Sequence, residues 1–292
     1  MEADLSTQIT TAFSQQFSTN VQLLSQQKGS LLRNAVSEES IVGEKAFFDQ
    51  IGSATAQKRT TRHGDTPLSD TPHSRRMVTM DHYEYADLID DPDKVQMLID
   101  PTSTYANAAA HAIGRAMDDS IIDAALGSAS TGKSGSTSTA LPAGQKVAVG
   151  SPAAGLTIAK LVEAKKILDQ NSVDPSIKRY IAVHPEQVED LLNSTTVTSS
   201  DFNTVKALVQ GDINTFLGFE FITSNRLNVD GSSHRKVFAW AEDGIKLAVG
   251  KDLKTEIGQR ADKSYSTQVY VCASFGATRM EEEKVVQILC SE

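Results

Sequence analysis

Apolar side chains recur at helical spacing over the first 28 residues. The surrounding residues are mostly Gln, Ser and Thr, which weaken the intrinsic preference for a helix. Two interpretations stay open: a helix packed on its own domain, or an arm that buries this stripe against a neighbouring subunit. In the second, Ile9, Phe13 and Phe17 are candidate interface residues. The stripe consists of Leu5, Ile9, Phe13, Phe17, Val21 and Leu24.

Residues 47–85 have the pattern of a long, exposed β-hairpin. Side chains from Met77 to Tyr85 alternate with a period of two, and Gly64 and Pro72 mark turns between the limbs. The limbs hold too few large apolar residues to form a core of their own. We therefore expect the hairpin to project from the body of the protein.

Basic side chains gather towards the tip of this hairpin, and acidic residues follow it from Asp81 to Asp93. This arrangement favours electrostatic pairing between copies of the chain. A solvated loop with ordinary surface charge remains an equal alternative. The candidate interface residues here are Arg59, Arg62, Arg75 and Arg76.

A long helix is predicted over residues 101–126, with Asp100 as its N-cap, Pro101 at its first position and Gly127 as its stop. At 1.5 Å per residue it spans roughly 39 Å. Its apolar and alanine positions recur at helical spacing, so one face should pack closely on a sheet or a second helix.

The remainder reads as a compact α/β unit followed by extended segments. Residues 127–152 are a Gly/Ser/Thr-rich connection with room for a small hairpin. Trp240 is expected in the core, Asp243-Gly244 to close a hairpin, and Gly276 to mark a bulge. We expect helices over 156–170 and 185–192, strands over 179–183 and 219–223, and extended chain over 265–290.

Composition narrows the class of protein. The chain has 292 residues, of which 39% are hydrophobic and 22% charged, as in a soluble folded protein. The net charge of -9 works against tight DNA binding, which needs basic residues. Cys272 and Cys290 are not in a CxxC pair and should be free thiols. The N-terminus is acidic where a secretory signal is basic, and no apolar run is long enough to span a membrane, so we expect the protein to stay in the cytoplasm.

One motif has the letters of a nucleotide-binding loop. Gly127-Ser-Ala-Ser-Thr-Gly132-Lys133-Ser134 matches GxxxxGK[ST], but that chemistry needs the loop to leave a strand and enter a helix. Here a long helix precedes the loop and a Ser/Thr-rich segment follows it. Nucleotide hydrolysis through Lys133 therefore remains only a weak alternative.

No other pattern indicates catalysis, a cofactor or a metal. The six histidines are scattered without an HxxxH pair, and no GxSxG occurs. His184-Pro-Glu186 has the HxE spacing of zinc deaminases but lacks their PCxxC partner. We expect His184 to end a strand and cap the next helix, and the protein not to be an enzyme.

The order of elements, together with particular stretches of sequence, resembles one family over nearly the whole chain. The stretches are QRADKSYSTQVY (259–270), FGATRMEEEKV (275–285), RYIAVHPEQVEDLL and LGFEFITSNRL. They are similar to the major capsid proteins of tailed bacteriophages, which have the α+β Hong Kong 97-type fold. This resemblance implies a structural subunit of the virion.

The resemblance also implies roles for segments and partners. It makes 1–46 an N-terminal arm, 47–85 an extended loop, 86–155 a peripheral domain with the spine helix 101–126, 156–250 an axial domain, and 251–292 the return of the peripheral domain. The chain would assemble with itself in hexamers and pentamers in the host cytoplasm, with a separate scaffolding protein, a portal and a decoration protein. It would enclose double-stranded DNA without specific binding and without a membrane. An encapsulin-like compartment is the alternative within the same fold.

Overall fold

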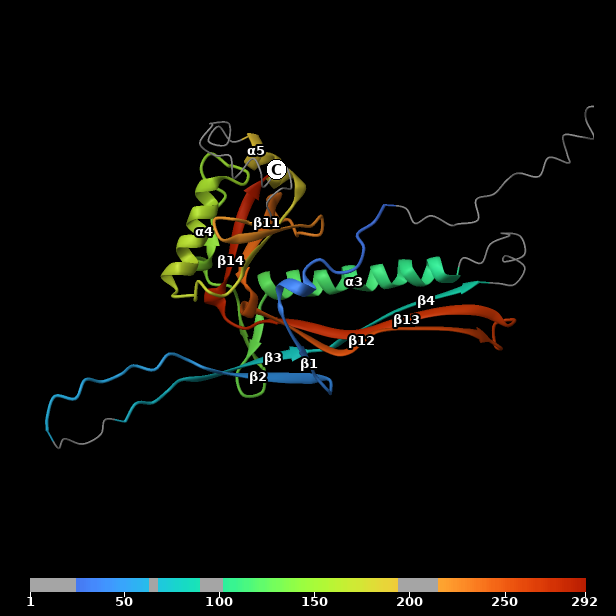
Figure 1. The fold of residues 1–292 in the computed structure, drawn as a ribbon, viewed down its shortest axis with the longest axis horizontal. Helices are drawn as coiled ribbons and strands as arrows, with labels where there is room; N and C mark the ends of the chain where they lie inside the picture. Colours follow the sequence, from blue (N-terminus) through green and yellow to red (C-terminus); the bar gives the residue numbers. More distant parts are fainter. Residues whose placement is uncertain (1–24, 63–67, 90–101, 194–214) are drawn as a thin grey trace, which may run out of the picture.

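The computed structural model describes residues 25–62, 68–89, 102–193 and 215–292. The candidate residues Ile9, Phe13 and Phe17 lie outside these ranges, as do Asp100 and Pro101. The described part contains three sheets and one long helix, α3 (Thr102–Leu126), which lies over the first sheet (Figure 1). The predicted spine helix is present, and it ends where the N–H of Gly127 donates to the carbonyl of Asp123 at 2.8 Å.

The first sheet lies along α3 and has the strand order β1-β12-β13-β4 (Figure 1). Ala109, Ile113 and Ile121 recur at helical spacing on α3 and are buried in one core with Val269 and Val271 of β13. This contact forms because the alternation of β13 gives the sheet an apolar face. The strands are β1 (Ser37–Ser40), β12 (Ile245–Arg260), β13 (Ser266–Arg279) and β4 (Asp81–Ile89).

The second sheet has six strands in the order β7-β14-β11-β8-β10-β9 and carries helices α4 and α5 (Figure 1). Trp240 of β11 is fully buried, as predicted, and its Nε1 donates to the carbonyl of Ala35 at 2.8 Å. Strands β8 and β10 and helix α5 lie where the sequence predicts them. The elements are β7 (Lys146–Val147), α4 (Ile158–Gln170), β8 (Arg179–Val183), α5 (Pro185–Asn193), β9 (Thr215–Phe216), β10 (Phe219–Thr223), β11 (His234–Ala241) and β14 (Val285–Ser291).

The third sheet contains the hairpin. Strands β2 (Lys45–Ile51) and β3 (His73–Thr79) pair antiparallel along their whole length, and the chain beyond them projects from the body (Figure 1). Strand β3 also pairs with β5 (Ala129–Thr131), which pairs with β6 (Thr137–Thr139). The segment between α3 and α4 thus holds a small hairpin, followed by the short helical turn η2 (Ala143–Gln145).

The predicted hairpin ends earlier than expected. Its returning limb stops at Thr79, and residues 81–85 belong to β4, which pairs with β13 in the first sheet. The period of two continues across Met80 and gives no sign of this change. Gly276 allows the change of sheet, because a side chain there would collide with the carbonyl oxygen of Thr79.

Three further predictions about the C-terminal half are wrong. Asp243-Gly244 does not close a hairpin, because β11 and β12 lie in different sheets joined by η3 (Glu242–Gly244). β14, expected in the peripheral sheet, pairs with β11 after η4 (Glu282–Lys284). The sheets therefore divide at η3 and η4 rather than at residue 250. Gly276 is not a bulge either, since the register shifts fall between Val249 and Lys254 of β12.

The segment before β1 is anchored in its own subunit. The carboxylate of Asp118 accepts hydrogen bonds from the Ser30 hydroxyl at 2.5 Å and from the Leu31 and Leu32 backbone N–H groups, both at 3.1 Å. Leu32 is fully buried beside η1 (Arg33–Ala35), and β1 pairs with β12. The expected arm of residues 1–46 thus includes a stretch that belongs to the core of its own chain.

Candidate subunit interface at the base of the hairpin

Arg75 and Arg76 are neighbours on β3, but their side chains lie on opposite faces of the strand. Arg75 is exposed and pairs with Asp49 across the hairpin, with Nε at 2.5 Å from Oδ1 and Nη2 at 3.0 Å from Oδ2. These hydrogen bonds lower the pKa of Asp49 below its ordinary value. The guanidinium of Arg75 also lies 5.4 Å from the ring centre of Phe47. Arg75 is therefore an accessible cation on the hairpin.

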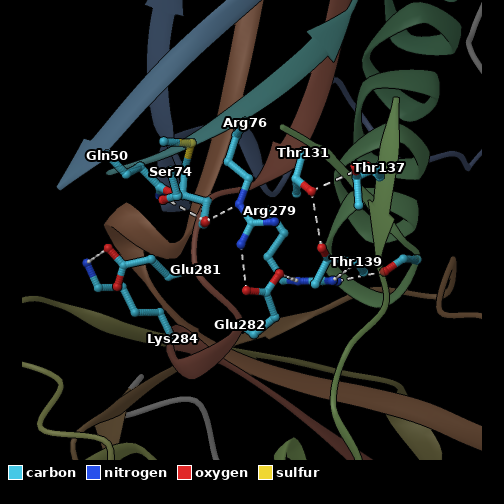
Figure 2. Close-up of polar contacts among 12 residues, drawn as sticks. Gln50, Ser74, Arg76, Thr131, Thr137, Thr139, Arg279, Glu281, Glu282 and Lys284 are labelled. Carbon is cyan, nitrogen blue, oxygen red and sulfur yellow. Dashed lines mark hydrogen bonds and ion pairs between the residues drawn. The ribbon is translucent and has the colours of Figure 1, made fainter. Parts of the chain in front are cut away.

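Arg76 is buried in its own subunit, with only 7% of the residue exposed. Its Nε donates to the carbonyl of Met280 at 2.7 Å, and its Nη2 donates to Glu282 Oε2 at 2.5 Å (Figure 2). The Nε2 of Gln50 on β2 donates to the same Met280 carbonyl at 2.9 Å. The prediction of Arg76 as an interface residue is therefore wrong: its charge holds the hairpin to the turn after β13.

Arg279 lies fully buried at the end of β13 beside this pair. It donates to three backbone carbonyls, those of Ala125 at 2.9 Å, Gly127 at 2.7 Å and Thr139 at 2.9 Å. Burial lowers the pKa of Arg279, and the nearby Glu282 opposes that effect. We call Arg76, Arg279 and Glu282 the arginine cluster. It joins the hairpin base, the end of α3 and the turn between the two larger sheets.

The arginine cluster is not fully satisfied. Among the described residues, Arg76 Nη1, Arg279 Nε and Glu282 Oε1 are buried without a hydrogen-bond partner. The last two face each other at 3.6 Å, which is beyond hydrogen-bonding distance. Two cations and one anion thus share one small buried space. Removal of Glu282 would leave two buried cations, and removal of Arg76 would leave Glu282 with Arg279 at 3.6 Å as its remaining cation.

A pocket of about 650 Å³ opens beside the cluster, between the hairpin and the β5–β6 turn. Asp49, His73, Arg75, Arg76 and Lys133 contribute to its lining. Lys133 is exposed and has no carboxylate partner within the part of the chain that the structure describes.

The GxxxxGK[ST] match forms the β5–β6 hairpin and not a phosphate-binding loop. The chain turns through Gly132 and Gly135, which have positive φ angles of 88° and 71°, and then enters strand β6. A nucleotide site needs the N-terminus of a helix at that point, where its backbone N–H groups face the phosphates. The alternative of nucleotide hydrolysis through Lys133 therefore lacks its structural basis.

The outer hairpin carries both exposed basic and exposed apolar side chains. Arg59 and Arg62 are exposed, and Arg59 Nε donates to the carbonyl of Thr61 at 3.0 Å. Phe47, Ile51 and Leu68 are exposed by 41%, 72% and 96%. These three apolar residues were not among the predicted interface residues, although Phe47 and Ile51 stand in the outgoing limb as an apolar pair four residues apart.

One group of metal-ligand types occurs in the described chain. His184, Glu186 and Glu292 have ligand atoms within 4.8 Å of one another. Glu292 is already held by Arg235, with Nε–Oε1 at 2.5 Å and Nη2–Oε2 at 2.9 Å, so a cation would have to displace a guanidinium. As predicted, His184 ends β8 and caps α5, where its carbonyl accepts from the N–H of Gln187 at 3.0 Å.

Both cysteines are buried free thiols, as predicted. Burial raises the pKa of Cys290 to about 12, because a thiolate would be poorly solvated there. No helix among the described residues is long and apolar enough to cross a membrane.

Comparison with known proteins decides the family. A family model described as "Phage capsid protein" matches residues 9–292. The chain belongs to the phage capsid protein family. The predicted major capsid protein is thereby confirmed, and this capsid protein is a subunit of an icosahedral shell. No curated protein sequence matches the chain.

Solved capsid structures share the fold of this capsid protein. The capsid of the cyanophage P-SCSP1u has a TM-score of 0.75 at 17% identity and covers 97% of this chain and 94% of its own. Mycobacterium phage Che8 has a TM-score of 0.69 at 16% identity, with 94% and 97% covered. The capsid of a native GTA particle has a TM-score of 0.71 at 11% identity, with both chains fully covered. The predicted Hong Kong 97-type fold is confirmed.

Proposed function

We propose that copies of this capsid protein assemble as hexamers and pentamers into a procapsid, which becomes a mature head around double-stranded DNA. The observation that carries the proposal is the projecting hairpin with exposed Ile51 and Leu68. A two-stranded hairpin is marginally stable alone, and burying one such side chain contributes about 1.5–3 kcal/mol. A neighbouring copy would supply the missing contact.

The segment roles follow from this proposal with the boundaries corrected. Residues 45–79 act as the extended loop over an adjacent subunit, α3 as the spine helix, and the six-stranded sheet with α4 and α5 as the axial domain. Each contact between copies can be weak, because closure of the lattice makes the later contacts effectively intramolecular.

We infer further partners from the same role. Assembly in the host cytoplasm uses a separate scaffolding protein and a portal, and a decoration protein binds the finished shell. The net charge of -9 suits a wall that lies near DNA without adhering to it. The protein acts as a structural subunit rather than an enzyme. An encapsulin-like compartment is the rival role, and packaged double-stranded DNA in purified particles would exclude it.

The hairpin proposal is tested by making its apolar side chains acidic. Ile51→Asp/Leu68→Asp is co-expressed with the phage's other head proteins, and particles are counted by sedimentation and electron microscopy. We expect a folded subunit with an unchanged circular dichroism spectrum but almost no particles. The control is Val229→Asp, at an exposed apolar residue outside the hairpin. Wild-type yield from the double variant refutes the role of the hairpin, and no particles from the wild type refutes the shell.

A further inference from the structure

The pocket between the hairpin and the β5–β6 turn has more positive than negative lining. Arg75, Arg76 and Lys133 carry three cations, against the one carboxylate of Asp49. We propose that this pocket is a socket for a carboxylate side chain of a second copy of the chain. The inference rests on the proposed shell, and it names a contact that the hairpin's apolar residues do not supply.

The cations that line the socket differ in how many partners they have within their own subunit. Arg75 is paired with Asp49, and Arg76 uses Nε and Nη2 within its own subunit. Arg76 Nη1 is buried and has no partner among the described residues, and Lys133 pairs with no described carboxylate. The Nη1 of Arg76 is closed off from solvent, so a carboxylate that enters the socket meets the free ammonium of Lys133, beside the guanidinium of Arg75 that Asp49 already holds.

The socket is held in shape before any partner arrives. Arg76 pairs with Thr131 in the ladder between β3 and β5, and the N–H of Gly132 donates to the carbonyl of Arg75 at 3.3 Å. Gly135 lies against the side chain of Met77 and leaves no room for a Cβ atom. The backbone at Lys133 is thus fixed to the hairpin, so only the lysine side chain has to be ordered when the contact forms.

Charge and size favour a protein carboxylate over a DNA phosphate. The chain has 37 acidic against 28 basic residues, so a second copy presents many carboxylates. A volume of about 650 Å³ admits one or two side chains. Binding to a duplex depends instead on rows of cations that neutralise successive phosphates.

The first test identifies the occupant directly. Particles are assembled from an equal mixture of ¹⁴N- and ¹⁵N-labelled chains and treated with a carbodiimide, which condenses an amine and a touching carboxyl group into an amide with loss of water. We expect mass spectrometry to find Lys133 joined to an Asp or Glu peptide of the other isotope. Lys133 left unlinked, or linked only within its own isotope, overturns the socket.

The second test reverses the charge. Because Lys133 is exposed without a described partner, Lys133→Glu should fold normally but lower particle yield by about tenfold or more, since like charges brought together at an interface cost several kcal/mol. Lys166→Glu, at an exposed lysine of α4, is the matched control and should assemble normally. Equal yields from both variants refute the socket while leaving the shell intact. A Lys133→Glu variant that forms shells but fails to retain DNA also overturns it and assigns the pocket to phosphate.

Discussion

The contrast between two adjacent arginines gives the sharpest prediction about this subunit. Arg76→Ala removes a guanidinium from the arginine cluster and leaves Glu282 buried, with its nearest remaining cation, Arg279, at 3.6 Å. Arg75→Ala removes an exposed side chain whose partner, Asp49, stays in water. The first variant should melt at a lower temperature than the wild type, and the second should melt at the same temperature.

The magnitude follows from the contacts that are lost. Removing one partner of a buried ion pair costs about 3–5 kcal/mol, because the other charge remains desolvated. The carbonyl of Met280 keeps its hydrogen bond from Gln50, so it adds no orphaned acceptor. With about 2.1 cal/mol/K per residue and 292 residues, the melting entropy is about 0.6 kcal/mol/K. The midpoint of Arg76→Ala should therefore fall by about 5–8 °C.

The assay is thermal unfolding of the unassembled subunit, followed by circular dichroism, with Arg75→Ala measured alongside. If only the loss of one positive charge mattered, the melting temperatures of Arg76→Ala and Arg75→Ala would fall by the same amount. If Arg76→Ala melts within a degree or so of Arg75→Ala, the buried pair does not hold the hairpin to the body, and the described role of the arginine cluster is wrong.

Two further predictions concern the contact between α3 and the segment before β1, and the buried thiol of Cys290. Gly114→Ala places a Cβ atom 2.6 Å from the backbone of Gly29, so hydrogen exchange of the backbone amides in the segment before β1 should become faster. Gly144→Ala is the control, because a Cβ atom there meets open space and should leave the exchange rates unchanged. Equal exchange rates in both variants would contradict this contact. Because the pKa of Cys290 is raised from 9 to about 12, unfolding releases its proton across that range, so the free energy of unfolding should fall as pH rises above about 9. Cys290→Ala should flatten this fall in urea titrations, and an unchanged slope would show that other groups cause it.

Local patterns predicted the elements well but not their partners. The period of two located the end of β3 and β13, and helical spacing located α3, because an element buried on one face alternates apolar and polar residues with its own period. Strands β8 and β10 were predicted as short extended runs. Strand pairing depends on residues distant in sequence. The local pattern showed neither the change of sheet after Thr79 nor the separation of β11 from β12. The period of two runs on from β3 into β4, and a turn signal between two strands does not say whether they pair with each other.

Part of the candidate site could be predicted from the sequence. Arg76 stands two residues before Val78 and four before Met80, both buried, so the period of two already places it on the inner face, while Arg75 points outward. That signal was available in the sequence. Its partner Glu282 was not, because it lies 206 residues away in a run of three glutamates that looks like a solvated surface.

The arginine cluster explains how an exposed hairpin can have a defined direction. Beyond β2 and β3 the projecting chain has few contacts with its own body, so its aim depends on its base. There, Arg76 and Gln50 bind the turn after β13, while Arg279 of that strand binds the end of α3 and Thr139. Buried polar contacts are directional and lose much when displaced, whereas apolar contacts tolerate sliding. Polar contacts within the subunit therefore set the direction of the hairpin, and its exposed apolar side chains can be buried by the copy of the chain that lies in that direction.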